Sequence, residues 1–249
     1  MIIFSIKLPF QMVLLGTIVS VSMMNAFAED AYEEKRQKMV AEIQLMMKMT
    51  EASVGKASLS GRVADAMMAV PRHKFVPTNI QPSAYENRAL PISHQQTISQ
   101  PYIVALMTEL AEVNSGSVVL EVGTGSGYQA AVLSELVSHV YSIEIVEPLG
   151  LEARLLLQDL GYENVTVRIG DGYYGWPEHA PFDAILVTAA AEHIPEQLIQ
   201  QLKPGGRLVI PVGEPWLSQS LRVLTKSTDG KISQRDVLPV AFVPLTGDH

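Results

Sequence analysis

The sequence predicts an α/β protein with a doubly wound, mostly parallel sheet and an antiparallel hairpin at its C-terminal edge. From Ser117 onward, short apolar strand patterns alternate with helix patterns, which is typical of parallel β–α–β units. The last two strand patterns are too close together for a helix to connect them, so we expect them to pair as a hairpin. A chain of 249 residues with 47% hydrophobic residues can bury one sizeable core.

The first 28 residues have the pattern of a secretory signal peptide. Lys7 is followed by an apolar run from Met12 to Met24, and the small residues Ala26 and Ala28 suggest cleavage after Ala28. The run is short for a membrane span, but an uncleaved anchor is an alternative, and a buried core helix is a second one. We expect export to the periplasm and no stable membrane association if the signal is used, and a cytoplasmic protein otherwise.

The chain is expected to contain three parts: the signal peptide or anchor over 1–28, an N-terminal helix and linker over 29–61, and the α/β domain over 62–249. In the second part, Val40, Ile43 and Met47 recur at helical spacing and predict a helix over 31–50, with a linker over 53–60.

A helix over 62–70 is expected to end before Pro71, and another to follow Pro101 over 102–112. Between them, residues 71–101 show little periodicity. Long irregular segments inside compact domains are usually functional or disordered, and this mixed sequence favours a function.

The remaining elements follow from apolar runs and amphipathic patterns, with Asp229 and Gly230 as the turn of the hairpin. We expect strands over 118–122, 139–145, 164–169, 182–188, 207–212, 220–226 and 237–245, and helices over 128–136, 148–160 and 194–202.

Composition excludes several kinds of partner and site. The net charge is −8 and the chain has no basic run, so a nucleic acid is not an expected partner. The absence of cysteine rules out disulfides, thiolate metal sites and a cysteine nucleophile. The histidines are scattered and lack metal-ligand spacing, so no metal site is expected.

A glycine-rich turn follows the first strand of the regular region. Gly123, Gly125 and Gly127 lie between this strand and a helix, where glycines let the backbone turn sharply and approach a ligand. Such a turn is also found as a plain β–α connection. The third glycine of the dinucleotide pattern is replaced by Tyr128, which argues against a nicotinamide dehydrogenase.

Acidic residues end the next two strands. Glu144 is placed to accept hydrogen bonds from ribose hydroxyls, and Asp171, before Gly172, is placed to accept one from an adenine amino group. No basic residue lies near the glycine turn to hold a phosphate, whereas Glu121 and Glu144 suit a cation. This pattern favours an adenosine ligand with a positive sulfonium, although a strand-end carboxylate is also found simply solvated.

Three stretches together resemble the protein-L-isoaspartate O-methyltransferase family over about residues 62–249. They are VLEVGTGSGYQAAVLSEL, GDGYYGWPEHAPFDAILVTAAAEHIPEQLIQQLKPGGRLVIPVG, and the upstream series AVPRHKFVP, AYENRALPI and QTISQPYIVALMTEL. The glycine turn is shared with many methyltransferases, whereas QTISQP is specific to the family. The resemblance implies a Rossmann-like sheet of the methyltransferase type and S-adenosyl-L-methionine as cofactor.

The resemblance also implies roles for individual residues. Gly123 and Gly125 would line the methionine end of the cofactor, Glu144 would hold its ribose, and Asp171 and Gly172 would lie at its adenine. Other positions with implied roles are Thr246, near the cofactor, Gln96, Thr97 and Ile98, in the loop between cofactor and substrate, and Ser99, as the catalytic residue of that loop. From the sequence alone, a cap of the helix after Pro101 is the favoured role of Ser99, and the resemblance reverses this preference.

The implied activity is methylation of the free α-carboxylate of L-isoaspartyl residues in damaged proteins and peptides, which starts their repair through a succinimide. Two other readings stay open: a methyltransferase for another substrate class, and a protein that binds isoaspartyl sites without catalysis. The family usually has glycines where this chain has Ser93 and Gln95, so a strained loop is expected if these positions need positive φ. The oligomeric state is not indicated.

Overall fold

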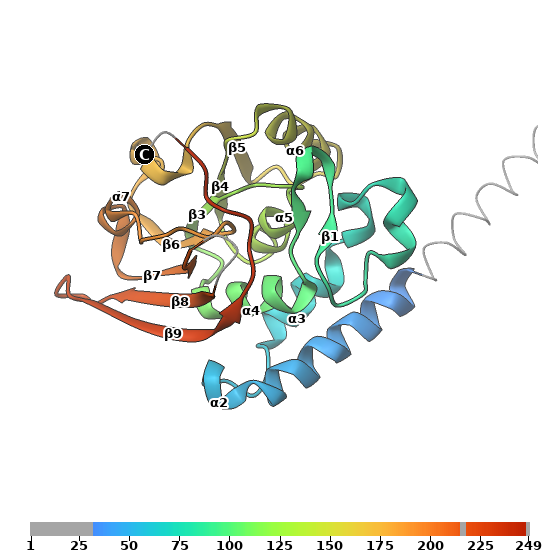
Figure 1. Ribbon diagram of the computed structural model, residues 1–249, viewed down its shortest axis with the longest axis horizontal. Coiled ribbons are helices and arrows are strands. Elements are labelled where there is room, and N and C mark those ends of the chain that lie inside the picture. Colours follow the sequence, from blue (N-terminus) through green and yellow to red (C-terminus); the bar gives the residue numbers. More distant parts are fainter. Residues whose placement is uncertain (1–31, 215–217, 248–249) are drawn as a thin grey trace, which may run out of the picture.

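The computed structural model describes residues 32–214 and 218–247. The predicted signal peptide over 1–28 lies outside the described residues. Among the described residues, no helix combines the length and the apolar character needed to cross a membrane. The described residues form the α/β fold that the sequence predicts, and Figure 1 shows its arrangement.

A seven-stranded sheet is the centre of the molecule, with the strand order β5-β4-β3-β6-β7-β8-β9. The pairs from β5 to β7 are parallel, and β7–β8 and β8–β9 are antiparallel, which confirms the predicted sheet and its hairpin. The strands are β3 (Val118–Val122), β4 (His139–Glu144), β5 (Val165–Ile169), β6 (Phe182–Val187), β7 (Leu202–Val212), β8 (Gln219–Lys226) and β9 (Ile232–Val240).

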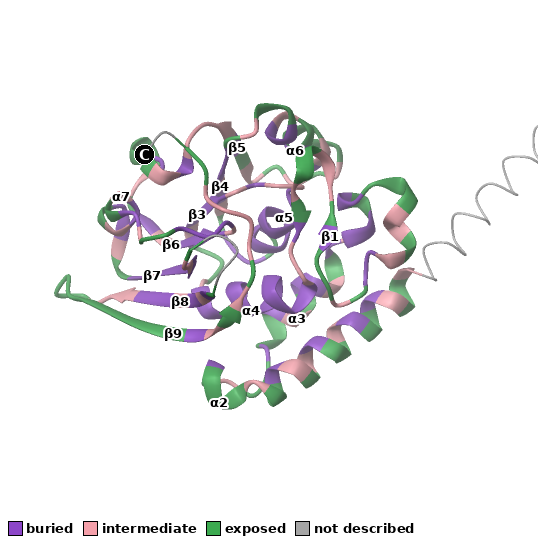
Figure 2. Ribbon diagram, viewed as in Figure 1, coloured by how far each residue is buried: buried purple, intermediate pink, exposed green. Residues whose placement is uncertain are grey.

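Helices cover both faces of the sheet because alternate strand residues point to opposite faces. Val119 and Leu186 belong to one buried cluster and Leu120 and Val187 to another. The first cluster includes residues of α3 (Gly61–Ala69), α4 (Pro101–Ala111) and α5 (Tyr128–Ser134), and α6 (Glu147–Asp159) contributes Leu157 to it. The second includes Leu198 of α7 (Glu196–Gln200). Figure 2 shows the buried central strands between these layers.

The N-terminal helix spans residues 32–49 and matches the predicted one. Ile43 and Met47 are buried, as the helical spacing predicts, whereas Val40 is only partly buried and Met39 is the third fully buried residue on this side. The expected linker instead begins with another helical turn, α2 (Glu51–Val54), and Ser60 then caps α3 by accepting a hydrogen bond from Val63 N.

The irregular segment over 71–100 contains only short elements. They are the 3-10 turns η1 (Arg72–Phe75), η2 (Thr78–Ser83) and η3 (Ser93–Gln95), and the two-residue strands β1 (Leu90–Pro91) and β2 (Thr97–Ile98). β1 and β2 pair with each other as a small antiparallel sheet. Buried residues of the segment, among them Phe75, Leu90 and Ile98, belong to the first hydrophobic cluster, so the segment packs on the sheet and its helices.

The predicted last strand over 237–245 is wrong in position. β9 begins at Ile232, directly after the turn, because antiparallel pairing with β8 starts as soon as the chain reverses at Asp229 and Gly230. Its first residues are exposed and, after Ile232, polar, so they lack the apolar pattern of a buried strand. The apolar run is divided: its first part completes β9, and residues 241–246 leave the sheet and cross in front of the strand ends (Figure 1).

Candidate active site

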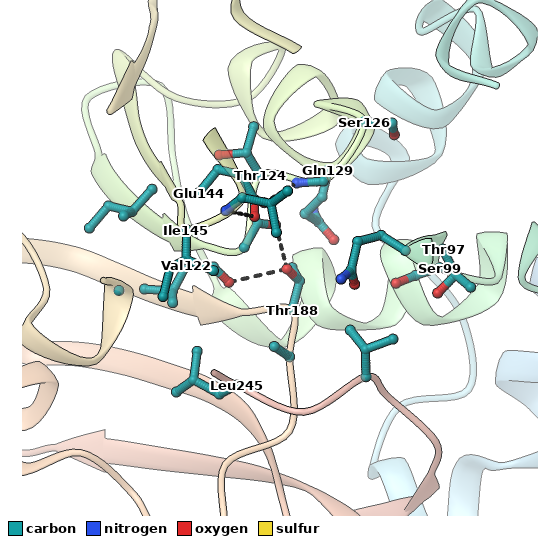
Figure 3. A pocket seen from close by; sticks show the side chains of 18 of the residues that line it. Thr97, Ser99, Val122, Thr124, Ser126, Gln129, Glu144, Ile145, Thr188 and Leu245 are labelled. Carbon is teal, nitrogen blue, oxygen red and sulfur yellow. Dashed lines mark hydrogen bonds between the residues drawn. The ribbon is translucent and has the colours of Figure 1, made fainter. Parts of the chain in front are cut away.

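A cavity of about 790 Å³, part of it open to solvent, lies at the carboxyl ends of β3, β4 and β6. Open α/β sheets bind ligands at this edge, because the loops after adjacent strands diverge there. Figure 3 shows side chains from segments far apart in the sequence around it, among them Ser99, Glu144 and Leu245. The lining residues are 96–99, Val104, 122–126, Tyr128, Gln129, 143–146, Gly172, Thr188, Ala189 and 243–246.

The glycine turn forms the floor of the cavity. Gly123 has φ 97°, and an added Cβ would collide with the Thr188 hydroxyl. That hydroxyl donates toward two carbonyl oxygens, of Gly123 at 2.5 Å and of Val122 at 3.1 Å (Figure 3). Only glycine combines this backbone conformation with the close approach of β6. Thr188 itself was not predicted, although its position at the end of a central strand was a usable signal.

Glu144 is fixed at the end of β4. Its carboxylate accepts a hydrogen bond from Gly125 N at 2.8 Å and another from Val146 N at 3.0 Å. Each carboxylate oxygen keeps a second lone pair for a ligand. Glu144 is also the one charged side chain among the residues that line the cavity within the described chain. The cavity therefore favours a neutral or cationic ligand with hydroxyl groups and disfavours a phosphate.

Glu121 behaves differently from the expectation that it supplies negative charge. It is completely buried beneath the glycine turn, and this burial raises its pKa to about 8. Ser142 donates a very short hydrogen bond to it, and the Ser142 hydroxyl also contacts Thr124 Oγ1 at 2.6 Å. At neutral pH the Glu121 side chain is thus mainly a protonated carboxyl that joins two strands to the turn, and Glu144 alone supplies charge.

The loop Gln96–Ser99 forms the opposite side of the cavity. Its backbone is held by the β1–β2 pairing and by Ile92 N, which donates to Gln96 O at 2.8 Å. The N-cap residue of α4 is Gln100, so the expectation that Ser99 caps this helix is wrong. In the described part of the chain, the Ser99 hydroxyl makes no hydrogen bond, which leaves it available to a ligand.

The two positions that usually hold glycine differ from each other. Gln95 has φ 59° and is left-handed, as expected for a glycine position, and His94 has φ 56° as well. Ser93 does not have positive φ, and its hydroxyl donates to Glu152 of α6 at 3.0 Å. His94 Nε2 lies 3.4 Å from the same carboxylate. The strain expected in this loop is therefore at 94–95, and Glu152 holds the loop against α6.

Gly172 lines the cavity, but Asp171 does not. The Asp171 carboxylate accepts a hydrogen bond from Tyr173 N at 2.9 Å and caps the short turn η4 (Gly172–Tyr174). The contact of Asp171 with an adenine stays a prediction. Ile145, which is 38% exposed beside Glu144, offers an apolar surface to a flat ring.

The C-terminal segment over 241–246 covers the cavity and brings Thr246 to it. Gln219 fixes this segment through both of its amide atoms: Phe242 N donates to Oε1 at 2.7 Å, and Nε2 donates to Phe242 O at 3.1 Å. Ala190 adds two backbone hydrogen bonds, to Val243 and from Leu245. The sequence carried no signal for Gln219, because its role depends on a contact made across the hairpin.

A second hollow adjoins the first and shares Thr97, Ser99, Thr188 and Val243 with it. Its other lining residues are 87–89, Gln100, Ile103 and 239–242. Ser99 therefore stands where the two hollows meet. Over residues 32–214 and 218–247, no group of three His, Asp or Glu side chains is placed to hold a metal ion.

The comparisons with known proteins agree with this geometry. The family model for protein-L-isoaspartate(D-aspartate) O-methyltransferase matches residues 42–249. A protein-L-isoaspartate O-methyltransferase 2 of Polaromonas sp. is 63% identical over 85% of this chain and 100% of its own length. One from Syntrophobacter fumaroxidans is 59% identical over 89% of this chain and 90% of its own length.

Solved structures show the same fold. A protein-L-isoaspartate O-methyltransferase aligns with a TM-score of 0.73 and 30% identity, covering 86% of this chain and 66% of that one. A family member from Plasmodium falciparum, in complex with S-adenosyl-L-homocysteine, aligns with a TM-score of 0.65 and 27% identity over 75% of this chain and 91% of its own. The chain belongs to the protein-L-isoaspartate O-methyltransferase family.

Proposed function

We propose that the protein transfers a methyl group from S-adenosyl-L-methionine to the free α-carboxylate of L-isoaspartyl residues in damaged proteins. The observation that carries this proposal is the position of Ser99. Its unengaged hydroxyl stands between a cavity suited to an adenosyl cation and a second hollow suited to a peptide. Family membership supports the same activity.

The residues of the first cavity fit S-adenosyl-L-methionine. Its lining includes one carboxylate and no cationic side chain in the described chain, and Glu144 has free lone pairs for ribose hydroxyls. Gly123 and Gly125 leave room for the methionine end, while Ile145, Gly172 and Thr246 surround the remaining space. When bound, the cofactor supplies a methyl group activated by a positively charged sulfur.

The acceptor needs little chemical help from the protein. A free α-carboxyl group has a pKa of about 3.5, so it is ionised at neutral pH and no general base is required. Ser99 Oγ–H donates a hydrogen bond that orients the carboxylate, and the segments over 96–99 and 243–246 exclude water from it. Alignment of reacting groups can supply on the order of 7–11 kcal/mol, which makes positioning the main contribution of these residues.

The second hollow takes the peptide on either side of the isoaspartyl residue. Its wall is largely apolar or uncharged, with Ile103 and Val240 on it and Arg88 as its charged member within the described residues. The methyl ester is released into water, where attack by a neighbouring backbone nitrogen displaces methanol and closes a succinimide. Hydrolysis of that ring returns part of the material to normal aspartate and needs no further residue of this chain.

Two other functions are less well supported. A methyltransferase for another substrate class would keep Glu144 and the glycine turn but would have no use for the QTISQP loop. A reader that binds isoaspartyl sites without turnover would not need the Glu144 carboxylate held by two backbone N–H groups.

Methyl transfer to an isoaspartyl peptide and to its normal aspartyl twin, by protein lacking residues 1–28, tests the proposal. We expect turnover of the isoaspartyl peptide alone. Turnover of neither peptide with intact cofactor binding would favour the other substrate class or the reader. No cofactor binding, with the isoaspartyl peptide still bound, would favour the reader alone.

The proposed site of action is the periplasm, reached by means of the signal peptide over 1–28, with 29–61 as an N-terminal extension of the domain over 62–249. The support is the pattern of Lys7, the apolar run and Ala28. N-terminal sequencing of the native protein tests it: a chain that starts at Glu29 supports export, and one that starts at Met1 supports an anchor or a cytoplasmic protein.

A further inference from the structure

Arg72 is a completely buried arginine behind the acceptor loop. Its Nε donates to Ala84 O at 2.7 Å, and its Nη2 donates to Ser99 O at 2.7 Å. Its guanidinium carbon lies 4.8 Å above the centre of the Tyr128 ring. Ser99 and Tyr128 both line the first cavity, so one side chain connects the acceptor loop with the helix that follows the glycine turn.

The charge of this arginine is not neutralised by a carboxylate. Among the described residues, its partners are the two carbonyl oxygens and the tyrosines Tyr128 and Tyr85, and its Nη1 has no hydrogen-bond partner. Burial lowers the pKa of Arg72 to about 10, so it still carries its charge at neutral pH. A buried cation with incomplete pairing is unfavourable compared with an apolar side chain of similar volume.

Local choices that weaken stability are expected where a function needs them. Arg72 is at such a position, because its charged group lies directly behind Ser99, the residue proposed to orient the substrate carboxylate. The fork of the guanidinium also spans two carbonyls from chain segments 15 residues apart in sequence, Ala84 and Ser99. A lysine ammonium is a point charge and lacks this planar fork.

We propose that Arg72 is a positioning residue of the methyl transfer, which fixes Ser99 through its carbonyl and favours the carboxylate of the isoaspartyl substrate by its charge. The inference rests on the proposed function of the same site. It assigns two separable contributions: the fork sets the orientation of Ser99 and thus kcat, and the charge sets the preference for an anionic over a neutral acceptor.

The chain offers a matched control in Arg62. This arginine also donates to two backbone carbonyls, of Val113 at 3.0 Å and of Leu136 at 2.7 Å, but it does not line or support the cavity. Loss of either arginine removes a comparable number of hydrogen bonds. Arg62 is exposed and Arg72 is buried, so their stabilities will differ, but a merely structural role for Arg72 predicts an unchanged kcat for both folded variants.

The experiment measures kcat, KM for an isoaspartyl peptide, and the Kd of S-adenosyl-L-homocysteine for wild type, Arg72→Met, Arg72→Lys and Arg62→Met. It also compares the inhibition constants of two peptides. One is an unreactive peptide that carries a carboxylate, and the other is the neutral methyl ester product. For Arg72→Met we expect kcat to fall about 30- to 100-fold, as for other small misplacements at a reacting centre. The Kd of S-adenosyl-L-homocysteine should stay within about threefold in Arg72→Met, since no hydrogen bond of Glu144 is changed.

Arg72→Lys should have a lower kcat but keep the preference for the carboxylate peptide. Arg72→Met should have a lower kcat and no preference. Arg62→Met should keep kcat and the preference. The inference is overturned if Arg72→Met matches Arg62→Met in kcat and preference. If Arg72→Met does not fold, Arg72→Lys decides: unchanged kcat overturns the positioning role, and a lower kcat with retained preference supports it. A wild-type enzyme without isoaspartyl activity refutes the proposed function instead, which keeps the two failures distinct.

Discussion

The two walls of the cavity are built in different ways. The cofactor wall consists of Gly123–Ser126 and Glu144–Val146, which follow the parallel strands β3 and β4 and are held by backbone and carboxylate contacts. The acceptor wall consists of residues 96–99 and 243–246, which belong to no long element and are fixed by the side chains of Arg72 and Gln219. The comparison teaches that a regular sheet holds the side of the cavity proposed for the cofactor, whereas hydrogen bonds from two side chains hold the side proposed for the acceptor.

This difference also explains what the sequence could predict. The cofactor wall follows from period and spacing, because a strand that ends in Gly123 and one that ends in Glu144 must meet at the same sheet edge. The acceptor wall was assigned through the QTISQP resemblance alone. Its supports, Arg72 and Gln219, act across 27 and 23 residues of sequence, where no periodicity carries a signal.

Asp171 stays a predicted contact of the adenine, and its carboxylate accepts a hydrogen bond from Tyr173 N at the start of a turn. The apolar residues 241–246 resemble the end of a strand but cover the cavity instead, because β9 had already begun at the turn.

The largest expected effect is a pH dependence of the free energy of unfolding, caused by Glu121 beneath the cofactor wall. Its pKa of about 8 in the native state lies above the ordinary 4.5, so the native state keeps a proton that the unfolded chain releases. The free energy of unfolding should therefore fall as pH rises from about 4.5 to 8, by at most about 5 kcal/mol. Glu121→Gln removes this dependence and should be more stable than wild type at pH 9 in denaturant melts.

Glu109→Gln is the control, because Glu109 is also buried but is paired with Lys56 and Ser60. It should lose stability at pH 7 and at pH 9 alike. A Glu121→Gln variant whose stability runs parallel to wild type over this pH range would show that Glu121 is ionised in the native state.

The next largest effect is a loss of cofactor affinity, which we expect for a change in the cofactor wall and not for one in the acceptor wall. Glu144→Ala removes the partner of Gly125 N and Val146 N as well as the proposed ribose ligand. Charged hydrogen bonds of this kind contribute about 1.5–3 kcal/mol each, so the Kd of S-adenosyl-L-homocysteine should rise about 100-fold by calorimetry. The exposed Glu147→Ala should leave it unchanged. An equal Kd for both variants would remove Glu144 from the cofactor wall.

Ser99→Ala tests the opposite wall. Loss of the hydrogen bond to the substrate carboxylate should lower kcat about 10- to 100-fold, since bonds to charged groups are worth about 1.5–3 kcal/mol. The cofactor Kd should remain within about threefold, because the hydrogen bonds that hold Glu144 come from Gly125 N and Val146 N and not from Ser99. Steady-state kinetics with the exposed Ser58→Ala as control checks this. Unchanged turnover in the folded Ser99 variant excludes Ser99 from the mechanism.

The smallest effect concerns strain in the acceptor wall. Gln95 has φ 59°, which costs a non-glycine residue about 1 kcal/mol. Gln95→Gly should therefore stabilise the protein slightly, by about 0.5 kcal/mol after the greater freedom of glycine in the unfolded chain is included. Gln96→Gly, at φ −95°, should destabilise it. Thermal melts that place the two variants in the reverse order would contradict the strained conformation.

A crystal structure of the protein with S-adenosyl-L-homocysteine tests the central assignment of the two walls most directly. We predict that the ligand occupies the cavity at the ends of β3 and β4, with its ribose hydroxyls at Glu144 and its sulfur toward Ser99. A ligand bound elsewhere, or turned so that its sulfur faces away from Ser99, would contradict the account.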